Sequence, residues 1–248
     1  GHCYDYTENI LKEIEENPLI YKNDIRIDKN AIAKLDSDYK NHFLDKLHIE
    51  NHEKTHFYFL KRIKQAEDQI GNIVEKLISR PDHEDPGIEY KKHIEQSICI
   101  LQEKAKDFDP QQFREEREKL YRNIFRKSFY LLTGKPGSGK TFETSKVIEH
   151  LDQTGQNLTI LAPTGKAALR LTENIQNNTG LDLKAETIDR FIYSNNMGWA
   201  YEDWGLLDNL SNTEKITVEN LIIDESSMID IEKLKVLMSI LRFDDEYP

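Results

Sequence analysis

The stretch YLLTGKPGSGKTF, residues 130–142, contains the pattern that decides the fold of this chain. A short apolar run ends at Gly134, a glycine-rich loop follows, and Lys140 and Thr141 open a stretch with helical spacing. Together these residues complete the pattern G-x-x-x-x-G-K-[ST], in which glycines allow backbone N–H groups to close around a phosphate. A helix that starts here adds the positive end of its dipole to the same anion. The stretch therefore predicts a strand, a phosphate-binding loop and a helix, in that order.

Two side chains of the loop have separate expected roles. Lys140 is expected to contact the β and γ phosphates of a nucleoside triphosphate, and the Thr141 hydroxyl is expected to ligate Mg²⁺. The other residues contribute backbone donors or shape. The expected nucleotide-binding residues are Gly134, Pro136, Gly137, Ser138, Gly139, Lys140, Thr141 and Phe142. The pattern thus predicts ATP and Mg²⁺ as the bound cofactors.

A second motif, LIIDESS at residues 221–227, is an apolar run that ends in Asp224 and Glu225. As a parallel strand, this run would place its carboxyl end at the sheet edge beside the phosphate loop. Asp224 is then expected to hold Mg²⁺ through water, and Glu225 to be the base that orients the attacking water. The predicted catalytic residues are Lys140, Asp224 and Glu225, and the predicted metal ligands are Thr141 and Asp224. The two motifs together predict a site that hydrolyses a nucleoside triphosphate.

Apolar residues in the first half of the chain recur every three or four positions. Such spacing places apolar side chains on one face of a helix. Examples are Tyr39, Phe43 and Leu47, the run at 59–77 and the run at 94–108. We therefore predict an all-α N-terminal domain over residues 1–110.

From residue 128 onward the pattern predicts a different fold class. Continuous apolar runs alternate with helical stretches, which is typical of a parallel sheet covered on both faces. The runs lie at 128–134, 158–163 and 219–225, and the helical stretches include 141–151 and 166–175. We therefore predict an α/β, P-loop NTPase domain with a parallel-sheet core over residues 111–248.

The composition limits the kinds of partner. Charged residues make up 32% of the 248 residues and apolar residues 38%, and no stretch approaches the roughly 20 apolar residues that span a bilayer, so no membrane partner is expected. Two cysteines are too few for a disulfide framework and favour a reducing cytoplasm. The net charge of −11 argues against nucleic-acid binding over the whole surface. Residues 111–170 nevertheless carry eleven Lys and Arg against six Asp and Glu, so a polyanion could be held there.

A third motif, LTILAPTGKAALRLTENI at residues 158–175, suits a phosphate ligand. It predicts a strand, a Pro-Thr-Gly turn and a helix whose first two turns present Thr164, Lys166 and Arg170. A hydroxyl, two cations and the backbone N–H groups of a helix N-terminus can bind a phosphodiester as well as a nucleotide. The alternative interpretation is a solvated helix start.

Four segments together resemble the RecD-like, superfamily 1B DNA helicases, the family of the exodeoxyribonuclease V alpha subunit. They are the phosphate loop, LAPTGKAALRLTENI at 161–175 as motif Ia, ETIDRFI at 186–192, and LIIDESSMIDI at 221–231 as motif II. The resemblance covers roughly residues 128–240. It implies a RecA-like motor domain in a cytoplasmic, bacterial-type protein that couples ATP hydrolysis to 5′-to-3′ movement along single-stranded DNA. The DNA contacts that it implies are Pro163, Thr164, Lys166, Thr187 and Arg190.

The sequence departs from this family at several points. Asp189 stands where the family usually has histidine, and a carboxylate repels phosphate. Gln111 and Gln112 do not have the spacing of the family's adenine-reading glutamine, so that residue is not assigned. The family's next motif and its second motor domain, with an arginine finger worth about 10³–10⁵ in rate, do not occur in these 248 residues. We therefore expect a fragment that binds ATP, hydrolyses it slowly and does not unwind DNA alone.

The resemblance and the alternatives imply different partners. A helicase fragment implies single-stranded DNA, the C-terminal motor domain of the parent chain, and protein partners of the helical N-terminal domain. The runner-up hypothesis is a switch or docking module that binds ATP and controls a partner without moving along DNA. DNA-stimulated ATPase activity of the full-length parent would separate these two hypotheses.

A different enzyme class is suggested by HEKTH, residues 52–56. His52, Glu53 and His56 match the zinc-peptidase pattern H-E-x-x-H, and His48 extends the row by a turn if the segment is helical. No third ligand stands out, and a solvated helix face is the favoured interpretation. Two tryptophans, Trp199 and Trp204, are interpreted as loop anchors on the core, with base stacking as the alternative.

Overall fold

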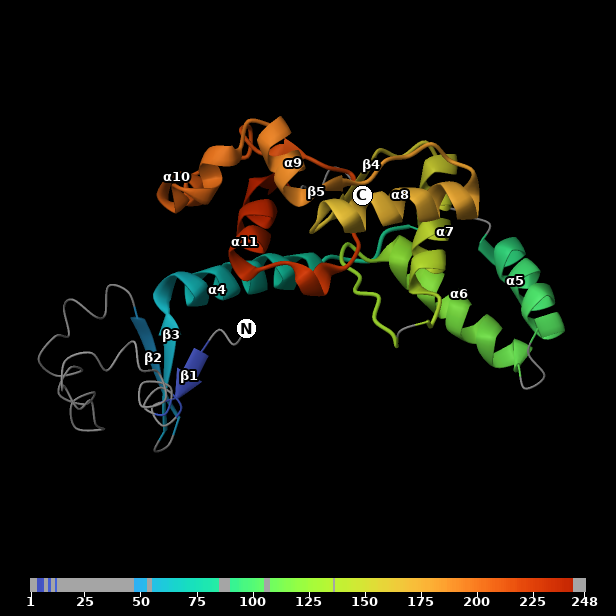
Figure 1. Cartoon of the computed structure of the whole chain (residues 1–248), viewed down its shortest axis with the longest axis horizontal. Helices are drawn as coiled ribbons and strands as arrows, with labels where there is room; N and C mark the ends of the chain where they lie inside the picture. Colours follow the sequence, from blue (N-terminus) through green and yellow to red (C-terminus); the bar gives the residue numbers. More distant parts are fainter. Residues whose placement is uncertain are drawn as a thin grey trace, which may run out of the picture. The chain divides into compact units, whose positions relative to one another are not determined.

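The computed structural model describes residues 4–6, 9, 12, 47–52, 55–84, 90–104, 108–135 and 137–242. Two residues of the predicted sites, Pro136 and Glu53, lie outside these ranges. The chain divides into two compact units, Gly1–Gly71 and Asn72–Pro248. Figure 1 shows the order of the elements along the chain.

The first unit contains a small antiparallel sheet. Its strands are β1 (Tyr4–Tyr6), β2 (Leu47–His52) and β3 (Thr55–Leu60), in the order β1-β3-β2. The helical prediction is therefore wrong for residues 47–52 and 55–60, and its other members, Tyr39 and Phe43, lie outside the described residues. The aromatic run of β3, HFYFL, explains the difference, because aromatic side chains favour the pleated, half-buried surface of a sheet.

Two helices lie where the helical spacing predicts them, and a third follows. They are α4 (Lys61–Ile78), α5 (Tyr90–Lys104) and α6 (Pro110–Arg126). Helix α6 begins at a proline, and the Asp109 carboxylate before it accepts hydrogen bonds from the backbone N–H groups of Gln111 at 2.9 Å and Gln112 at 3.0 Å. The residue types at these positions are the ones that helix N-termini favour.

The core of the second unit is a parallel sheet, as predicted. Its strands are β4 (Leu158–Ala162), β5 (Glu186–Thr187) and β7 (Asn220–Ile223), in the order β5-β4-β7. The register pairs Ala162 with Thr187 and Leu161 with Ile223. Because the strands are parallel, the loops that follow all three begin at one edge of the sheet.

Helices and short elements complete this unit. Helices α7 (Lys140–Gln153) and α8 (Gly165–Thr179) pack against each other (Figure 1). The remaining elements are α9 (Ile188–Ser194), η1 (Gly198–Tyr201), α10 (Trp204–Asp208), β6 (Ile216–Thr217), η2 (Ser226–Met228), α11 (Ile231–Ile240) and β8 (Leu241–Arg242). Strands β6 and β8 pair in parallel.

Two apolar clusters position the loops of the sheet edge. One joins β4 to α9 and α11, with Leu161, Ile188 and Leu237 fully buried. The other joins α5, α6 and α7 through residues such as Tyr121 and Val147. The phosphate-loop helix α7 is therefore fixed by the helices that precede it as well as by the sheet.

The predicted strand at 128–134 does not form. These residues have no regular secondary structure and pair with no described strand. A strand requires a hydrogen-bonding neighbour at about 4.7–4.9 Å. Residues of this segment and residues of β7 line one cavity, and among the described strands β7 pairs only with β4.

Candidate nucleotide-binding site

At the glycine positions of the phosphate loop, any other residue would strain the backbone or contact a neighbouring side chain too closely. Gly137 and Gly139 have φ angles of 77° and 84°, in the left-handed region, and Gly139 is the N-cap of α7. A Cβ atom on Gly134 would lie 2.6 Å from the Ser138 Oγ atom. The pattern of glycines that defines the motif therefore has a direct steric cause in this loop.

The Lys140 ammonium lies folded across the loop. Its Nζ atom donates to the carbonyl oxygens of Gly134 at 2.7 Å and Lys135 at 3.1 Å. Carbonyl oxygens carry only partial negative charge, so the oxygens of a phosphate group would compete with them for this cation. The side chain is thus held at the loop by these two hydrogen bonds.

One cavity contains the polar side chains of both motifs. It has a volume of about 970 Å³, and Lys140, Thr141, Asp224 and Glu225 all line it. The backbone N–H of Asp224 donates to the carbonyl oxygen of Leu161 at 3.1 Å, which fixes the first residue after β7 against β4. Two segments that are 80 residues apart in the sequence therefore line the same cavity.

Glu225 has an unusual backbone conformation. Its φ and ψ angles are 52° and 38°, in the left-handed region that few residues other than glycine adopt. The backbone N–H of Met228 donates to the Glu225 carbonyl oxygen at 3.0 Å, which holds the turn. Such conformations concentrate at functional sites, where the surrounding structure maintains them.

The other predicted loop residues do not all face the cavity. Gly134 lines it, whereas Gly137, Ser138, Gly139 and Phe142 do not. The Phe142 ring packs against the His93 ring with 5.6 Å between the ring centroids. The prediction that Phe142 binds nucleotide therefore has no support from the cavity.

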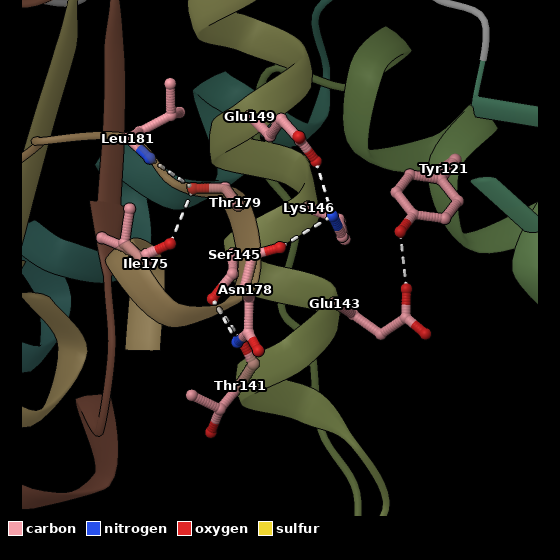
Figure 2. Close-up of polar contacts among 10 residues, drawn as sticks. All are labelled: Tyr121, Thr141, Glu143, Ser145, Lys146, Glu149, Ile175, Asn178, Thr179 and Leu181. Atoms are coloured by element: carbon pink, nitrogen blue, oxygen red, sulfur yellow. Dashed lines mark hydrogen bonds and ion pairs between the residues drawn. The ribbon is translucent and has the colours of Figure 1, made fainter. Parts of the chain in front are cut away.

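A buried carboxylate ties α6 to the first turn of α7. Glu143 is 5% exposed, and its two oxygens accept hydrogen bonds from Arg117 Nε and from the Tyr121 hydroxyl, both at 2.6 Å (Figure 2 shows the Tyr121 contact). Burial, and then the nearby Glu143 charge, raise the pKa of Tyr121 well above its usual value, so this hydroxyl keeps its proton. The spacing of apolar residues does not predict this contact, because Glu143 meets Arg117 and Tyr121 only when α6 and α7 pack against each other.

Polar contacts also join α7 to α8 (Figure 2). The Ser145 hydroxyl donates to the Thr141 carbonyl oxygen at 2.9 Å and accepts from Asn178 Nδ2 at 3.2 Å. Lys146 Nζ donates to the Asn178 carbonyl oxygen at 2.9 Å and to Glu149 at 2.8 Å. The turn that carries Thr141 is therefore anchored to the helix that follows β4.

Two histidines, His93 of α5 and His150 of α7, are a further feature that sequence reasoning missed. The His150 ring packs against the rings of Tyr121, Phe125 and His93, with centroid distances of 5.8, 6.1 and 6.1 Å. Burial lowers the pKa of both His93 and His150. The helical spacing indicates which face is buried, but not that two imidazoles share it.

The predicted DNA-contact residues lie at the ends of β4 and β5. Thr164 Oγ1 accepts from the backbone N–H of Ala167 at 3.3 Å and caps α8, and Thr187 Oγ1 accepts from that of Arg190 at 3.1 Å and caps α9. The register of β4 and β5 places these two helix starts side by side. Both hydroxyls are therefore engaged within the protein.

The remaining members of this set differ in exposure. Lys166 is exposed, and the Arg190 side chain is 80% exposed with its Nε atom 3.9 Å from Glu186 Oε2. Pro163 is buried, so its ring is not presented to a ligand. The structure therefore leaves two cations of the predicted set at the surface.

Asp189 is bound within the protein. Its Oδ1 atom accepts from the Tyr201 hydroxyl at 2.6 Å, and its Oδ2 atom accepts from Lys233 Nζ at 2.9 Å. Burial acts to raise the pKa of Asp189, but the hydrogen bonds from Tyr201 and Lys233 outweigh it and lower the pKa below its usual value. The Lys233 cation offsets the repulsion that this carboxylate would exert on a phosphate.

The zinc-peptidase interpretation is wrong in its structural premise. His52 is in β2 and His56 is in β3, and the register pairs His52 with Thr55 and Asn51 with His56. Paired positions share a face of a sheet and neighbouring positions alternate, so the two histidine positions belong to opposite faces instead of one helix face. In the described ranges of the chain, no three His, Cys, Asp or Glu residues form a group that could hold a metal ion. None of the helices described is both long and apolar enough to span a bilayer.

Comparisons with known proteins agree with this geometry. A family model described as an AAA domain matches residues 117–247. An uncharacterized protein of Methanocaldococcus jannaschii is 28% identical over 90% of this chain and 20% of its own length. The RecBCD enzyme subunit RecD of Haemophilus influenzae is 27% identical over 58% of this chain and 24% of its own length. The ATP-dependent RecD2 DNA helicase of Deinococcus radiodurans is 26% identical over 69% of this chain and 20% of its own length.

The chain spans about a fifth to a quarter of the length of these relatives. The family model covers more than half of the chain, including the phosphate loop and the acidic motif. The chain belongs to the AAA-domain family and is a RecD-like, superfamily 1 helicase-related P-loop protein.

Proposed function

We propose that this chain is the ATP-binding part of a RecD-like DNA helicase, which couples ATP hydrolysis to 5′-to-3′ movement along single-stranded DNA. The observation that carries the proposal is the single cavity lined by Lys140, Thr141, Asp224 and Glu225. The similarity to a RecBCD enzyme subunit RecD and to an ATP-dependent RecD2 DNA helicase supports DNA as the partner. Because the chain spans a quarter or less of those proteins, helicase activity is proposed for the whole parent protein.

The side chains of the cavity fit a nucleotide with Mg²⁺. A hydroxyl from Thr141 and a carboxylate from Asp224 are oxygen donors of the kind that Mg²⁺ prefers. Gly134 also lacks a Cβ atom, which would lie 2.6 Å from Ser138 Oγ and crowd the loop. When bound, the ion would neutralise charge on the β and γ phosphate oxygens.

The side chains then divide the work of hydrolysis. Lys140 exchanges its two carbonyl acceptors for phosphate oxygens and so favours the transition-state charge. Glu225, at the turn after Asp224, orients the attacking water and accepts its proton. A second motor domain of the parent would add the arginine that accelerates the reaction.

The DNA track is proposed for the sheet edge where α8 and α9 begin. Lys166 and Arg190 supply exposed cations there, and the backbone N–H groups of α8 point in the same direction. Pro163, Thr164 and Thr187 support the track by shaping and capping the two helix starts. Contacts to phosphate give affinity without sequence preference, as movement along DNA requires.

Three broader statements also remain proposals. The first motor domain is proposed to begin near residue 111, after an N-terminal region that contains the β1-β3-β2 sheet with helices α4 and α5 and offers a surface to protein partners. The parent is proposed to be cytoplasmic. All three follow from the sequence and the resemblance.

ATPase activity of the full-length parent tests the proposal. Single-stranded DNA is expected to stimulate it, and Glu225→Gln is expected to abolish hydrolysis while ATP binding persists. An ATPase that is indifferent to DNA would favour the switch or docking module instead. Lys166→Ala together with Arg190→Ala should weaken the DNA stimulation and leave the basal rate intact.

A further inference from the structure

An exposed aromatic ring lies beside the proposed DNA track. Tyr193 is 63% exposed at the end of α9, three residues after Arg190, whose side chain is 80% exposed. Residues at i and i+3 share a face of a helix. One face of α9 therefore presents together the Arg190 cation, which the family resemblance assigns to DNA, and the Tyr193 ring, which it does not.

The Tyr193 ring is held against the returning chain. A Cβ atom on Gly198 would lie 2.4 Å from the Tyr193 Cε1 atom, so the ring rests directly on the backbone of η1. Asn196 has a φ angle of 60°, and the Met197 N–H donates to the Ile192 carbonyl oxygen at 2.9 Å, which makes the turn tight enough for this contact. The glycine thus permits an approach that any other residue would prevent.

A chain of contacts continues beneath the ring. The Tyr201 ring lies 6.2 Å from the Tyr193 ring, centroid to centroid, with 33° between the ring planes. The Tyr201 hydroxyl donates to Asp189, and Asp189 accepts from Lys233 of α11. Tyr193 is therefore an exposed ring on a fixed support, and the support explains why an aspartate occupies position 189.

The tryptophans of this region have a different environment. Trp199 and Trp204 pack as half-buried side chains against the cluster of β4, α9 and α11, as the anchor interpretation predicts. The Trp204 ring also lies 3.8 Å from the Nζ atom of Lys235, which is 1% exposed. The two tryptophan rings pack against the apolar cluster, whereas most of the Tyr193 side chain faces solvent.

We propose that Tyr193 stacks on a base of single-stranded DNA while Arg190 contacts an adjoining phosphate. The inference rests on the proposed function and adds a base-contacting residue to it. Every base has an aromatic face, so stacking adds affinity without sequence preference. The phosphate must displace Glu186, which lies 3.9 Å from Arg190 Nε. The fixed support lowers the entropy that the ring loses on binding.

The test compares two labelled oligonucleotides by fluorescence anisotropy on the 248-residue chain. One is an oligodeoxythymidine and the other has the same length and phosphates but lacks bases. Tyr193→Ala is expected to weaken binding of the first by about fivefold or more and to leave binding of the second nearly unchanged. Tyr193→Phe should retain the wild-type preference, and Ile100→Ala, which truncates a 52% exposed side chain on α5, should change neither affinity.

The outcomes separate this inference from the proposed function. If the wild-type chain binds the oligodeoxythymidine and Tyr193→Ala binds it equally well, the stacking inference is overturned and the motor proposal stands. If the wild-type chain binds neither oligonucleotide, the stacking inference is overturned, whereas the motor proposal is decided by the DNA-stimulated ATPase activity of the full-length parent. If circular dichroism shows that Tyr193→Ala does not fold, Tyr193→Leu replaces it, because leucine keeps apolar bulk without an aromatic face.

Discussion

The buried Glu143 carboxylate gives the sharpest prediction about stability. Its Oε1 atom lies 2.6 Å from Arg117 Nε, and its Oε2 atom accepts from the Tyr121 hydroxyl at 2.6 Å. Glu143→Ala removes both acceptors at once. It leaves a guanidinium that is 18% exposed without its counter-ion and a fully buried hydroxyl without its acceptor.

The expected magnitude follows from these burials. Removing one partner of a buried ion pair costs about 3–5 kcal/mol, and leaving a buried hydroxyl without an acceptor costs about 1–3 kcal/mol. The two costs overlap, because Arg117 retains some exposure and can turn toward solvent. We therefore expect Glu143→Ala to lower the free energy of unfolding by about 3–5 kcal/mol.

Urea denaturation followed by circular dichroism measures this loss. Glu95→Ala is a matched control, because Glu95 pairs with Arg114 through the same atoms at the same distance of 2.6 Å but is exposed. This control is expected to leave the denaturation midpoint nearly unchanged, since exposed pairs contribute little. The reasoning is refuted if Glu143→Ala and Glu95→Ala give equal midpoints.

Two further predictions concern pH and the loop. Burial lowers the pKa of His93 and His150, so the unfolded chain binds more protons than the folded chain below about pH 6.5. Stability, measured as the thermal midpoint, should therefore fall as the pH drops from 7.5 to 5.5. A midpoint that stays constant across this range in the wild type, or that falls equally in a His93→Gln, His150→Gln double variant, would contradict this cause. Gly139→Ala should cost about 1–2 kcal/mol of strain at a φ of 84° and weaken ATP binding, whereas Gly155→Ala, at a φ of 73° and outside the cavity, should cost similar stability and leave ATP affinity intact, as calorimetry and denaturation can check.

The sequence predicts those parts of this fold that depend on local pattern. The glycine spacing of 134–141 defines the loop because each conformation is set within a few residues. The apolar runs at 158–163 and 219–225 become β4 and β7 because both are continuous and each has a neighbour to pair with. Asp224 reaches the cavity because the end of a parallel strand has a fixed place in such a sheet.

Features that depend on distant contacts could not be predicted in this way. Residues 128–134 have strand composition but pair with no described strand. Residues 47–52 and 55–60 form antiparallel strands because aromatic content outweighs a short helical spacing. The burial of Glu143 between Arg117 and Tyr121 arises only when α6 and α7 pack. The position of Tyr193 over Gly198 likewise depends on the turn between α9 and η1.

The central claim is that Lys140 binds the phosphates of ATP together with Mg²⁺ in the cavity that Asp224 lines. Calorimetric titration of the 248-residue chain with ATP, with and without Mg²⁺, measures it directly. Lys140→Ala should weaken Mg²⁺-dependent binding by about tenfold or more, since it removes a charge-assisted contact, while Lys135→Ala, which removes an exposed cation from the same loop, should have a much smaller effect. Equal ATP affinities for the wild type and Lys140→Ala would contradict the account.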